Sequence, residues 1–154
     1  DIDLIFTMPN SDTDGRIIRK MIDNFVLVHK QRSISFNSLG RLKYLSTLKF
    51  VDGVVGNSSS GLLEAPIFNI GTINIGDRQK GRLKARSVID CANTKESIRK
   101  SILKLYSKDF QNFLPNVISP YGEGNEGKII DVLRDYKIPK ELKKEFYDFW
   151  NIVL

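Results

Sequence analysis

Short apolar runs alternate with amphipathic stretches along most of this chain, and this alternation constrains the fold more than any other feature. Short continuous apolar runs are typical of buried strands, whereas apolar residues three or four positions apart are typical of helices. The runs predict strands at residues 2–9, 33–36, 51–56, 71–76 and 87–92. Strands that alternate with helices form parallel sheets with helices on both faces. We therefore expect an α/β fold, a Rossmann-like doubly wound parallel sheet.

The amphipathic stretches predict the helices between these strands. The first helix begins at Asp12 or Thr13 and runs to about Phe25, and its apolar face consists of Ile17, Ile18, Met21, Ile22 and Phe25. Residues 25–30, FVLVHK, followed by SISF at 33–36, predict one or two strands. The other expected helices lie at 39–50 with Leu42, Leu45 and Leu48 inward, at 60–68 interrupted by Pro66, from the capping Thr94 to about 105, and at 126–137 and 140–152. Residues 114–127 predict a loop.

The composition fits a globular domain with a substantial core. The chain has 154 residues, of which 41% are hydrophobic and 27% charged. Its net charge of +6 favours anionic partners, but much of the excess lies on helical faces, as at Lys140, Lys143 and Lys144. No zinc-finger spacing or aromatic–basic RNA motif is present, and no apolar run approaches the ~20 residues that span a bilayer. We therefore expect neither nucleic acid nor a membrane as partner, and a cytoplasmic location.

Cysteine and histidine are scarce. Cys91 is the single cysteine, so the sequence predicts no disulfide framework, and we expect neither a metal site nor a cofactor. Cys91 lies in an apolar run and is expected in the core. His29, the single histidine, is expected to be a structural or surface residue. The chain starts at Asp1 rather than Met, directly before an apolar run, which indicates a piece of a longer protein.

A serine-rich segment follows the strand predicted at 51–56. Asn57, Ser58, Ser59, Ser60 and Gly61, here called the serine loop, precede a predicted helix. The first N–H groups of a helix lack intrahelical partners and favour an anion, serine hydroxyls add donors, and glycine allows close approach. The segment therefore fits a pyrophosphate cradle. An ordinary helix cap and turn explains the same residues, because Ser and Asn favour both positions.

Two charged residues extend this candidate site. Glu64 lies about one helical turn after Ser60, so both can face one crevice, and its carboxylate could accept the two hydroxyls of a ribose. Its alternative role is to complement the helix dipole. Arg78 follows the strand predicted at 71–76 and is suited to an oxyanion, although a basic surface loop with Lys80 and Arg82 is the alternative.

These residues also carry a resemblance to a known family. The segments GNSSSGLLEAP (56–66), TINIGDRQKGR (72–82) and SVIDC (87–91) resemble the C-terminal half of the UDP-N-acetylglucosamine 2-epimerases, most closely the hydrolysing branch. TMPNSDTDG, SLGRLKYLSTLKFVDGVVGN and YGEGN support the resemblance in the same order, over about residues 3–137. The resemblance implies a two-domain glycosyltransferase-B-type architecture, of which this chain is the C-terminal half.

The resemblance also implies roles for individual residues. Positions matching Ser58, Ser59, Glu64 and Arg78 bind UDP in the family, Asn10 matches a further nucleotide contact, and Asp14 is a weaker match. The family's proton-transferring acids belong to the N-terminal domain, so no catalytic residue is expected here. The implied reaction removes the sugar C2 proton, eliminates UDP, and adds water to give the free 2-epimeric sugar, of the N-acetylmannosamine type used in sialic acid pathways. This chain alone is expected to be inactive.

The expected organisation follows from the same resemblance. Residues 1–137 are expected to form the nucleotide-binding domain, and the helix in 138–154 to dock on the N-terminal domain; a homo-oligomer is also expected. Two alternatives remain open. The chain could be the donor-nucleotide domain of a glycosyltransferase, or a non-catalytic nucleotide-binding module, because the serine loop and Glu64 would serve either.

Overall fold

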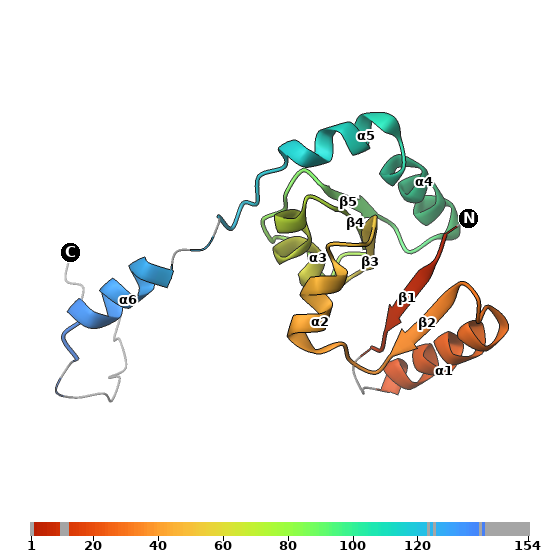
Figure 1. Cartoon of the computed structure of the whole chain (residues 1–154), viewed down its shortest axis with the longest axis horizontal. Helices are drawn as coiled ribbons and strands as arrows, with labels where there is room; N and C mark the ends of the chain where they lie inside the picture. Colours follow the sequence, from red (N-terminus) through yellow and green to blue (C-terminus); the bar gives the residue numbers. More distant parts are fainter. Residues whose placement is uncertain (1, 10–12, 123, 125, 139, 141–154) are drawn as a thin grey trace, which may run out of the picture. The chain divides into compact units, whose positions relative to one another are not determined.

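The computed structural model describes residues 2–9, 13–122, 124, 126–138 and 140. The chain forms two compact units, residues 1–121 and 122–154. The first unit contains β1 (Leu4–Thr7), α1 (Thr13–Val28), β2 (Ser33–Phe36), α2 (Gly40–Thr47), β3 (Gly53–Gly56), α3 (Ser60–Leu63), the 3-10 helix η1 (Ala65–Phe68), β4 (Gly71–Ile75), β5 (Val88–Cys91), α4 (Lys95–Leu105), α5 (Lys108–Phe113) and the 3-10 helix η2 (Leu114–Asn116) (Figure 1). The second unit contains α6 (Glu126–Asp135).

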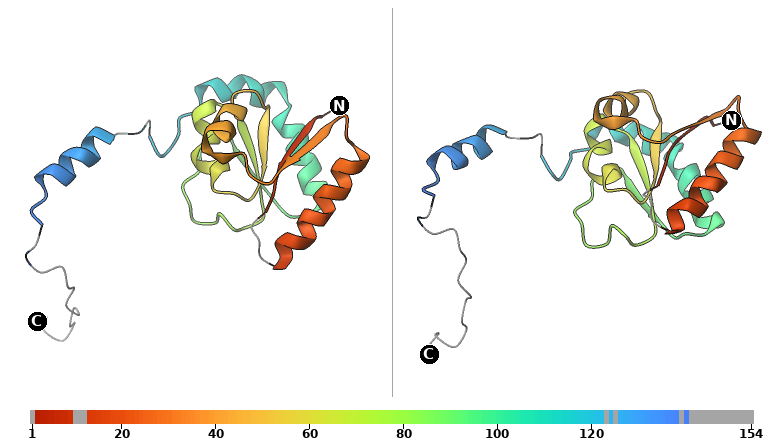
Figure 2. Two further views of the ribbon diagram at one scale, coloured as in Figure 1. Left: turned by 60° about the horizontal axis from the view of Figure 1, so that its bottom comes forward. Right: turned by 90° about the horizontal axis from the view of Figure 1, so that it is seen from below.

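All strand pairings of the described residues are parallel. β1 pairs with β2, and β4 lies between β3 and β5, with Ile73 of β4 opposite Val55 and Ile89. α4 packs on β4 and β5, whereas α3 contacts β3 and β4 from the other side of the sheet (Figures 1 and 2). The expected α/β, Rossmann-like fold with parallel strands is therefore confirmed, with its strands distributed over two sheets, β1–β2 and β3–β4–β5.

The core of the first unit lies between β4, β5 and the helices α4 and α5. Four of the five residues of β4 are buried, because this strand has a neighbour on each side and helices on both faces. The buried apolar cluster includes Ile73, Ile89, Cys91, Leu105, Phe110 and Leu114. The prediction that Cys91 is a packed core residue is therefore confirmed. His29 is exposed, as expected, and stacks on Phe25 with 4.4 Å between ring centroids.

Of the one or two strands expected over residues 25–36, one forms, β2 at Ser33–Phe36, and residues 25–28 are helical. Helix α1 continues to Val28, and the N–H of His29 still donates to the carbonyl of Phe25 at 2.9 Å. Phe25 packs edge-to-face against Phe6 of β1, with ring centroids 5.7 Å apart. This contact favours one more helical turn and outweighs the β preference of Val26 and Val28, since tertiary packing commonly overrides propensity.

The predicted inward face of the second helix is also partly wrong. Leu42 is 81% exposed, whereas Leu48 is 2% exposed. The buried direction is set by Tyr44 and Leu48, which are four positions apart and joined by the bond from the Leu48 N–H to the Tyr44 carbonyl at 3.1 Å. The spacing of three residues from Leu42 to Leu45 and Leu48 is as typical of a buried helical face as the spacing of four from Tyr44 to Leu48. The sequence alone therefore did not distinguish the Leu42 face from the Tyr44 face.

The remaining helices follow the sequence closely. Thr94 caps α4 by accepting from the Ser97 N–H at 3.3 Å, as predicted. The helix expected at 60–68 is divided at Glu64 into α3 and η1, and Pro66 lies in the first turn of η1. α5 was not predicted, and its signal is the capping Ser107, which accepts from the Phe110 N–H.

The predicted C-terminal helices divide between described and undescribed residues. α6 confirms the helix expected at 126–137, whereas nearly all of the helix at 140–152 lies outside the described residues. The domain boundary at 137 and the docking of 138–154 therefore stay predictions. In the described part of the chain, no helix is both long enough and apolar enough to cross a membrane.

Candidate functional site

The serine loop lies at the carboxyl end of β3, where it leads into α3. The Gly61 N–H donates to the Ser58 carbonyl at 3.3 Å, and the Ser60 N–H donates to the Ser58 hydroxyl at 3.4 Å. Two of the expected anion donors are thus engaged within the loop. Among the described residues, the N–H groups of Ser58 and Ser59 form no hydrogen bond, so they are the backbone donors that a ligand could use.

Gly61 joins the serine loop to the sheet. Its carbonyl accepts from the Thr72 hydroxyl of β4 at 2.8 Å, and both residues are buried. A Cβ atom at Gly61 would lie 2.5 Å from the Thr72 Cγ2. Glycine at this position therefore has a packing role: it allows α3 to approach β4 more closely than any side chain would permit.

Arg78, in the loop after β4, reaches the serine loop. Its guanidinium donates to the Asn57 carbonyl at 3.1 Å, and the Gln79 amide donates to the same carbonyl at 2.7 Å. Gln79 is 2% exposed, whereas Arg78 is exposed to solvent. The loops that follow β3 and β4 are therefore tied together, and Arg78 lines the same cavity as Asn57 and Ser58 of the serine loop.

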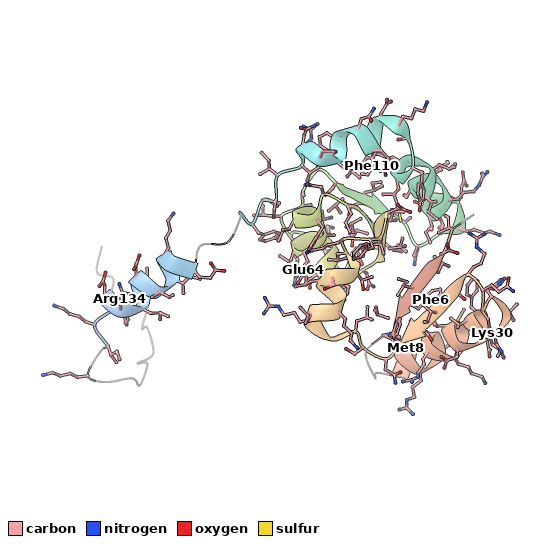
Figure 3. The ribbon with its side chains drawn as sticks, in the orientation of Figure 1. Phe6, Met8, Lys30, Glu64, Phe110 and Arg134 are labelled. Atoms are coloured by element: carbon pink, nitrogen blue, oxygen red, sulfur yellow. The ribbon has the colours of Figure 1, made fainter. Side chains whose placement is uncertain are left out.

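Glu64 follows α3 and lies close to α2 (Figure 3), near Tyr44 and Ser60. The hydroxyls of Tyr44 and Ser60 are hydrogen-bonded to each other. Burial and the charge of Glu64 raise the pKa of Tyr44, against the opposing effect of the Ser60 bond, so the phenol stays protonated. The Oε2 atom of Glu64 is buried and has no hydrogen-bond partner among the described residues, which leaves a strong acceptor available.

A cavity of about 750 Å³ opens beside these groups. Of the predicted site residues, Ser58, Ser60, Gly61 and Arg78 line it, together with Asn57 and Tyr44. Ser59 and Glu64 are not among the residues that line it. Asn10 lies outside the described residues, and nothing is described of the Asp14 side chain.

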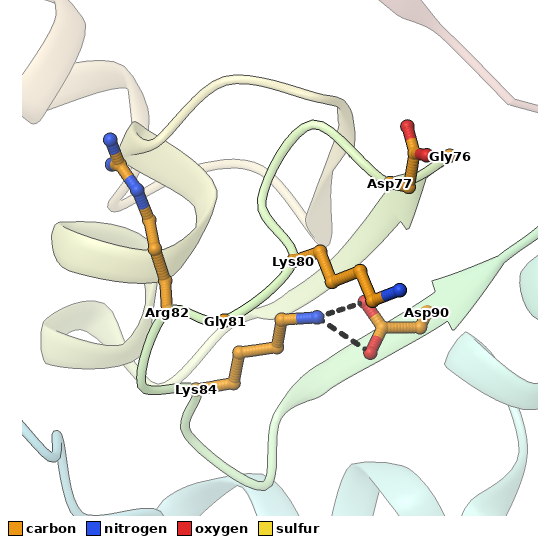
Figure 4. A pocket seen from close by; sticks show the side chains of 7 residues that line it. All are labelled: Gly76, Asp77, Lys80, Gly81, Arg82, Lys84 and Asp90. Carbon is orange, nitrogen blue, oxygen red and sulfur yellow. Dashed lines mark hydrogen bonds and ion pairs between the residues drawn. The ribbon is translucent and has the colours of Figure 1, made fainter.

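A second hollow of about 370 Å³ lies at the carboxyl ends of β4 and β5 (Figure 4). Lys84 donates to both carboxylate oxygens of Asp90 at 2.8 Å, and the buried Asn74 donates to one of them at 2.7 Å. Figure 4 shows Lys80 extending toward Asp90 and Arg82 pointing away from it. Burial acts to raise the pKa of Asp90, but the bonds from Lys84 and Asn74 outweigh it and hold that pKa below its ordinary value.

This pKa predicts an acid-sensitive contribution to stability. A carboxylate with a depressed folded-state pKa stabilises the fold at pH values above its unfolded pKa of about 4, and this contribution is lost as the pH falls through the folded value. Because Asp90 is 56% exposed, the effect should be below about 1 kcal/mol. Thermal unfolding of the parent and of Asp90→Asn from pH 7 to pH 2.5 should show the difference shrinking as the pH falls. A constant difference would contradict it.

Parallel strands covered by helices define a Rossmann-like domain. In such domains ligands bind at the carboxyl edge of the sheet, which is where these polar residues lie. Residues 1–134 match the family model described as UDP-N-acetylglucosamine 2-epimerase, and the chain belongs to this family.

Three relatives illustrate the match. The GDP/UDP-N,N'-diacetylbacillosamine 2-epimerase (hydrolyzing) of Campylobacter jejuni is 40% identical over 147 residues, 94% of this chain and 38% of the relative. The polysialic acid biosynthesis protein P7 of Escherichia coli is 36% identical over 151 residues, which are 97% of this chain and 38% of the relative. The UDP-N,N'-diacetylbacillosamine 2-epimerase (hydrolyzing) of Legionella pneumophila is 35% identical over 107 residues, which are 70% of this chain and 28% of the relative. The chain thus spans less than two fifths of these relatives' lengths.

Sequence reasoning missed three residues of this region: Tyr44, Asn57 as a carbonyl acceptor, and Gln79. Tyr44 was a detectable candidate, because it lies one helical turn before Leu48 and carries a hydroxyl that needs a partner when it is buried. Gln79 and the Asn57 carbonyl carried no signal in the sequence, since their role depends on how two loops meet in space.

Proposed function

We propose that this chain supplies the nucleotide-binding half of a hydrolysing UDP-sugar 2-epimerase. The observation that carries the proposal is the tie between two loops through the Asn57 carbonyl, which brings Arg78 to the serine loop, where the Ser58 and Ser59 N–H groups are unpaired among the described residues. A guanidinium and unpaired backbone donors at the carboxyl edge of a parallel sheet suit a diphosphate. Membership of the epimerase family supports the reaction class.

Glu64 is proposed to hold the ribose. Its unpaired, buried Oε2 atom requires a donor, and the vicinal hydroxyls of a ribose supply two. Tyr44 and Ser60, which are bonded to each other, line the cavity, and we place the ribose next to them, where it would reach the Glu64 carboxylate. A carboxylate beside a diphosphate is tolerated where it contacts hydroxyls instead of phosphate oxygens.

In the proposed reaction, the C2 proton of the UDP-sugar is removed, the bond between the anomeric carbon and the UDP oxygen breaks, and water adds to the glycal to release the 2-epimeric sugar. This chain would hold UDP and stabilise the departing diphosphate through Arg78 and the amides of Ser58 and Ser59. Proton transfer at C2 is assigned to residues outside 1–154, as is the partner domain. The exact sugar, an acetamido or a diacetamido hexose, belongs to the same proposal.

The test uses the full-length polypeptide. Isothermal titration with UDP should show saturable binding that uridine does not reproduce, and incubation with the UDP-sugar alone should release UDP and a free 2-epimeric sugar in equal amounts. Release of UDP only when an acceptor is present would favour the glycosyltransferase alternative. Binding of UDP without any turnover would favour the non-catalytic module.

The role of Arg78 gives a specific prediction. Arg78→Lys keeps the charge but loses the planar pair of donors, so we expect UDP to bind about 10-fold more weakly, while uridine binding is unchanged. Arg82→Lys in the same loop is the matched control and should leave UDP affinity unaltered, because Arg82 lines the other hollow. Unchanged affinity in Arg78→Lys would indicate general charge attraction, and equal losses in both variants would show that the effect is not specific to Arg78; either result would contradict a specific phosphate contact.

A further inference from the structure

Four strands in the described part of the chain, β1, β2, β3 and β5, each have one hydrogen-bonding edge without a neighbour, and of these β1 and β3 line the same cavity. In β1, the N–H of Leu4 bonds to the Arg32 carbonyl beside β2, so by alternation Ile5 directs its backbone groups to the opposite edge. In β4, the Thr72 N–H bonds toward β5, so Ile73 bonds toward β3 and its partner Val55 directs its own groups away from β4. The open edges of the two sheets therefore carry Ile5 and Val55.

The burial of β1 and β3 contrasts with that of β4, the strand with a neighbour on each side. β4, with a strand on each side, has four buried residues, whereas β1 and β3 have none. Ile5 is 47% exposed and Val55 is 53% exposed, although both are apolar. Strands of parallel sheets are normally buried on both faces. The exposure of β1 and β3 is what an internal strand shows when its neighbour is absent.

The space between these strands is the 750 Å³ cavity described above. Residues 5–7 of β1 form one wall and Gly53–Gly56 of β3 form the other, and Ile18 and Ile22 of α1 also line it. The two sheets present β1 and β3 as their facing edge strands (Figure 1), and no hydrogen bond joins these strands among the described residues. The serine-loop end of this cavity is polar, and its remainder is apolar and strand-lined.

The strand order identifies what fits there. A doubly wound Rossmann sheet has the order 3-2-1-4-5-6. The observed order β2–β1, then β3–β4–β5, is this order without its first and central strand. In that topology the first strand connects to the second, here β1, through a right-handed crossover helix.

We propose that a sixth parallel strand inserts between β1 and β3, and that a strand–helix segment of the same polypeptide upstream of β1 supplies it. The matched part makes up 38% of each of two relatives, so most of their length lies outside it. These relatives therefore contain chain that can provide such a segment. The inserted strand joins the two sheets into one. Its carboxyl end lies at the switch point beside the serine loop, so the turn after it belongs to the ligand site.

Disulfide trapping in the full-length polypeptide tests the position of β1 relative to β3. With a strand between them, β1 and β3 are about 9.6 Å apart, twice the strand spacing, and Cα atoms more than about 7 Å apart cannot be bridged. Four double-cysteine variants, combining Ile5 or Phe6 with Val54 or Val55, should yield at most about a tenth of the cross-link of the control. The control pair is Ile5→Cys with Ile34→Cys, which are Cα partners in β1 and β2.

Hydrogen exchange in the same full-length protein tests whether the edges are covered. The N–H groups of Ile5 and Val55 should exchange as slowly as that of Ile73, which lies inside the β3–β4–β5 sheet. Rapid exchange at either position would mean an open edge and overturn the proposal. A β1–β3 cysteine pair that cross-links as well as the control would mean direct pairing and overturn it equally.

Discussion

The Gly61→Ala variant is expected to have a free energy of unfolding about 1–3 kcal/mol lower than that of the parent protein, as is usual when a side chain is forced into a packed interior. The new Cβ would lie 2.5 Å from the Thr72 Cγ2, and both residues are buried between α3 and β4. Relief requires a shift of α3, which would also strain the bond from the Thr72 hydroxyl to the Gly61 carbonyl. Urea unfolding of the full-length protein measures the loss.

A second substitution separates this overlap from other effects of alanine. Thr72→Ser removes Cγ2 but retains the hydroxyl, and the next contact of the added Cβ is then the Thr72 Oγ1 at 3.4 Å. Thr72→Ser alone should cost about 1 kcal/mol for the lost methyl group, while the double variant should be less destabilised than the sum of the two single variants. Additive losses would show that the Cγ2 overlap is not the cause.

The Glu64→Ala variant is expected to bind UDP about 10- to 100-fold more weakly, because a hydrogen bond to a charged group contributes about 1.5–3 kcal/mol. Without ligand, the Glu64→Gln variant should be as stable as the parent, because the parent buries a carboxylate oxygen without a partner among the described residues. Urea unfolding of the two proteins measures this. Weaker binding without a weaker fold would identify Glu64 as a ligand contact. Calorimetric titration of the full-length variants provides the affinities.

Two controls make the ribose assignment specific. A UDP analogue lacking both ribose hydroxyls should bind the parent and Glu64→Ala with equal affinity, because the proposed contact is absent in both. Glu96→Gln offers a surface substitution as control, since Glu96 is 76% exposed and forms a salt bridge with Lys100 on its own helix. It should leave UDP affinity unchanged. An analogue that still distinguishes Glu64→Ala from the parent would contradict the ribose contact.

The order of strands and helices could be predicted because it depends on local patterns. Apolar runs mark β3, β4 and β5, and the side chain of Thr94 caps α4 through a contact three residues away. Cys91 could be assigned to the core for the same reason, since its run of apolar neighbours faces the sheet interior.

Features that depend on distant contacts could not be predicted. The extension of α1 to Val28 depends on Phe6, which is far from Phe25 in the sequence. The choice between the Leu42 and Tyr44 faces of α2 depends on Ser60, whose hydroxyl bonds to Tyr44. The division into two sheets is less predictable still, because we infer that the strand joining them lies outside these residues.

The Asn57 carbonyl, shared by Arg78 and Gln79, has a consequence for the energetics of ligand capture. Because the buried Gln79 anchors that oxygen, the segment between β3 and α3 is restrained before any ligand arrives, and less chain entropy remains to be lost on binding. Arg78, on the solvent side of the same oxygen, can exchange this bond for a phosphate without releasing the segment. The two donors thus have different roles: Gln79 keeps the serine loop rigid, and Arg78 can turn toward a bound phosphate.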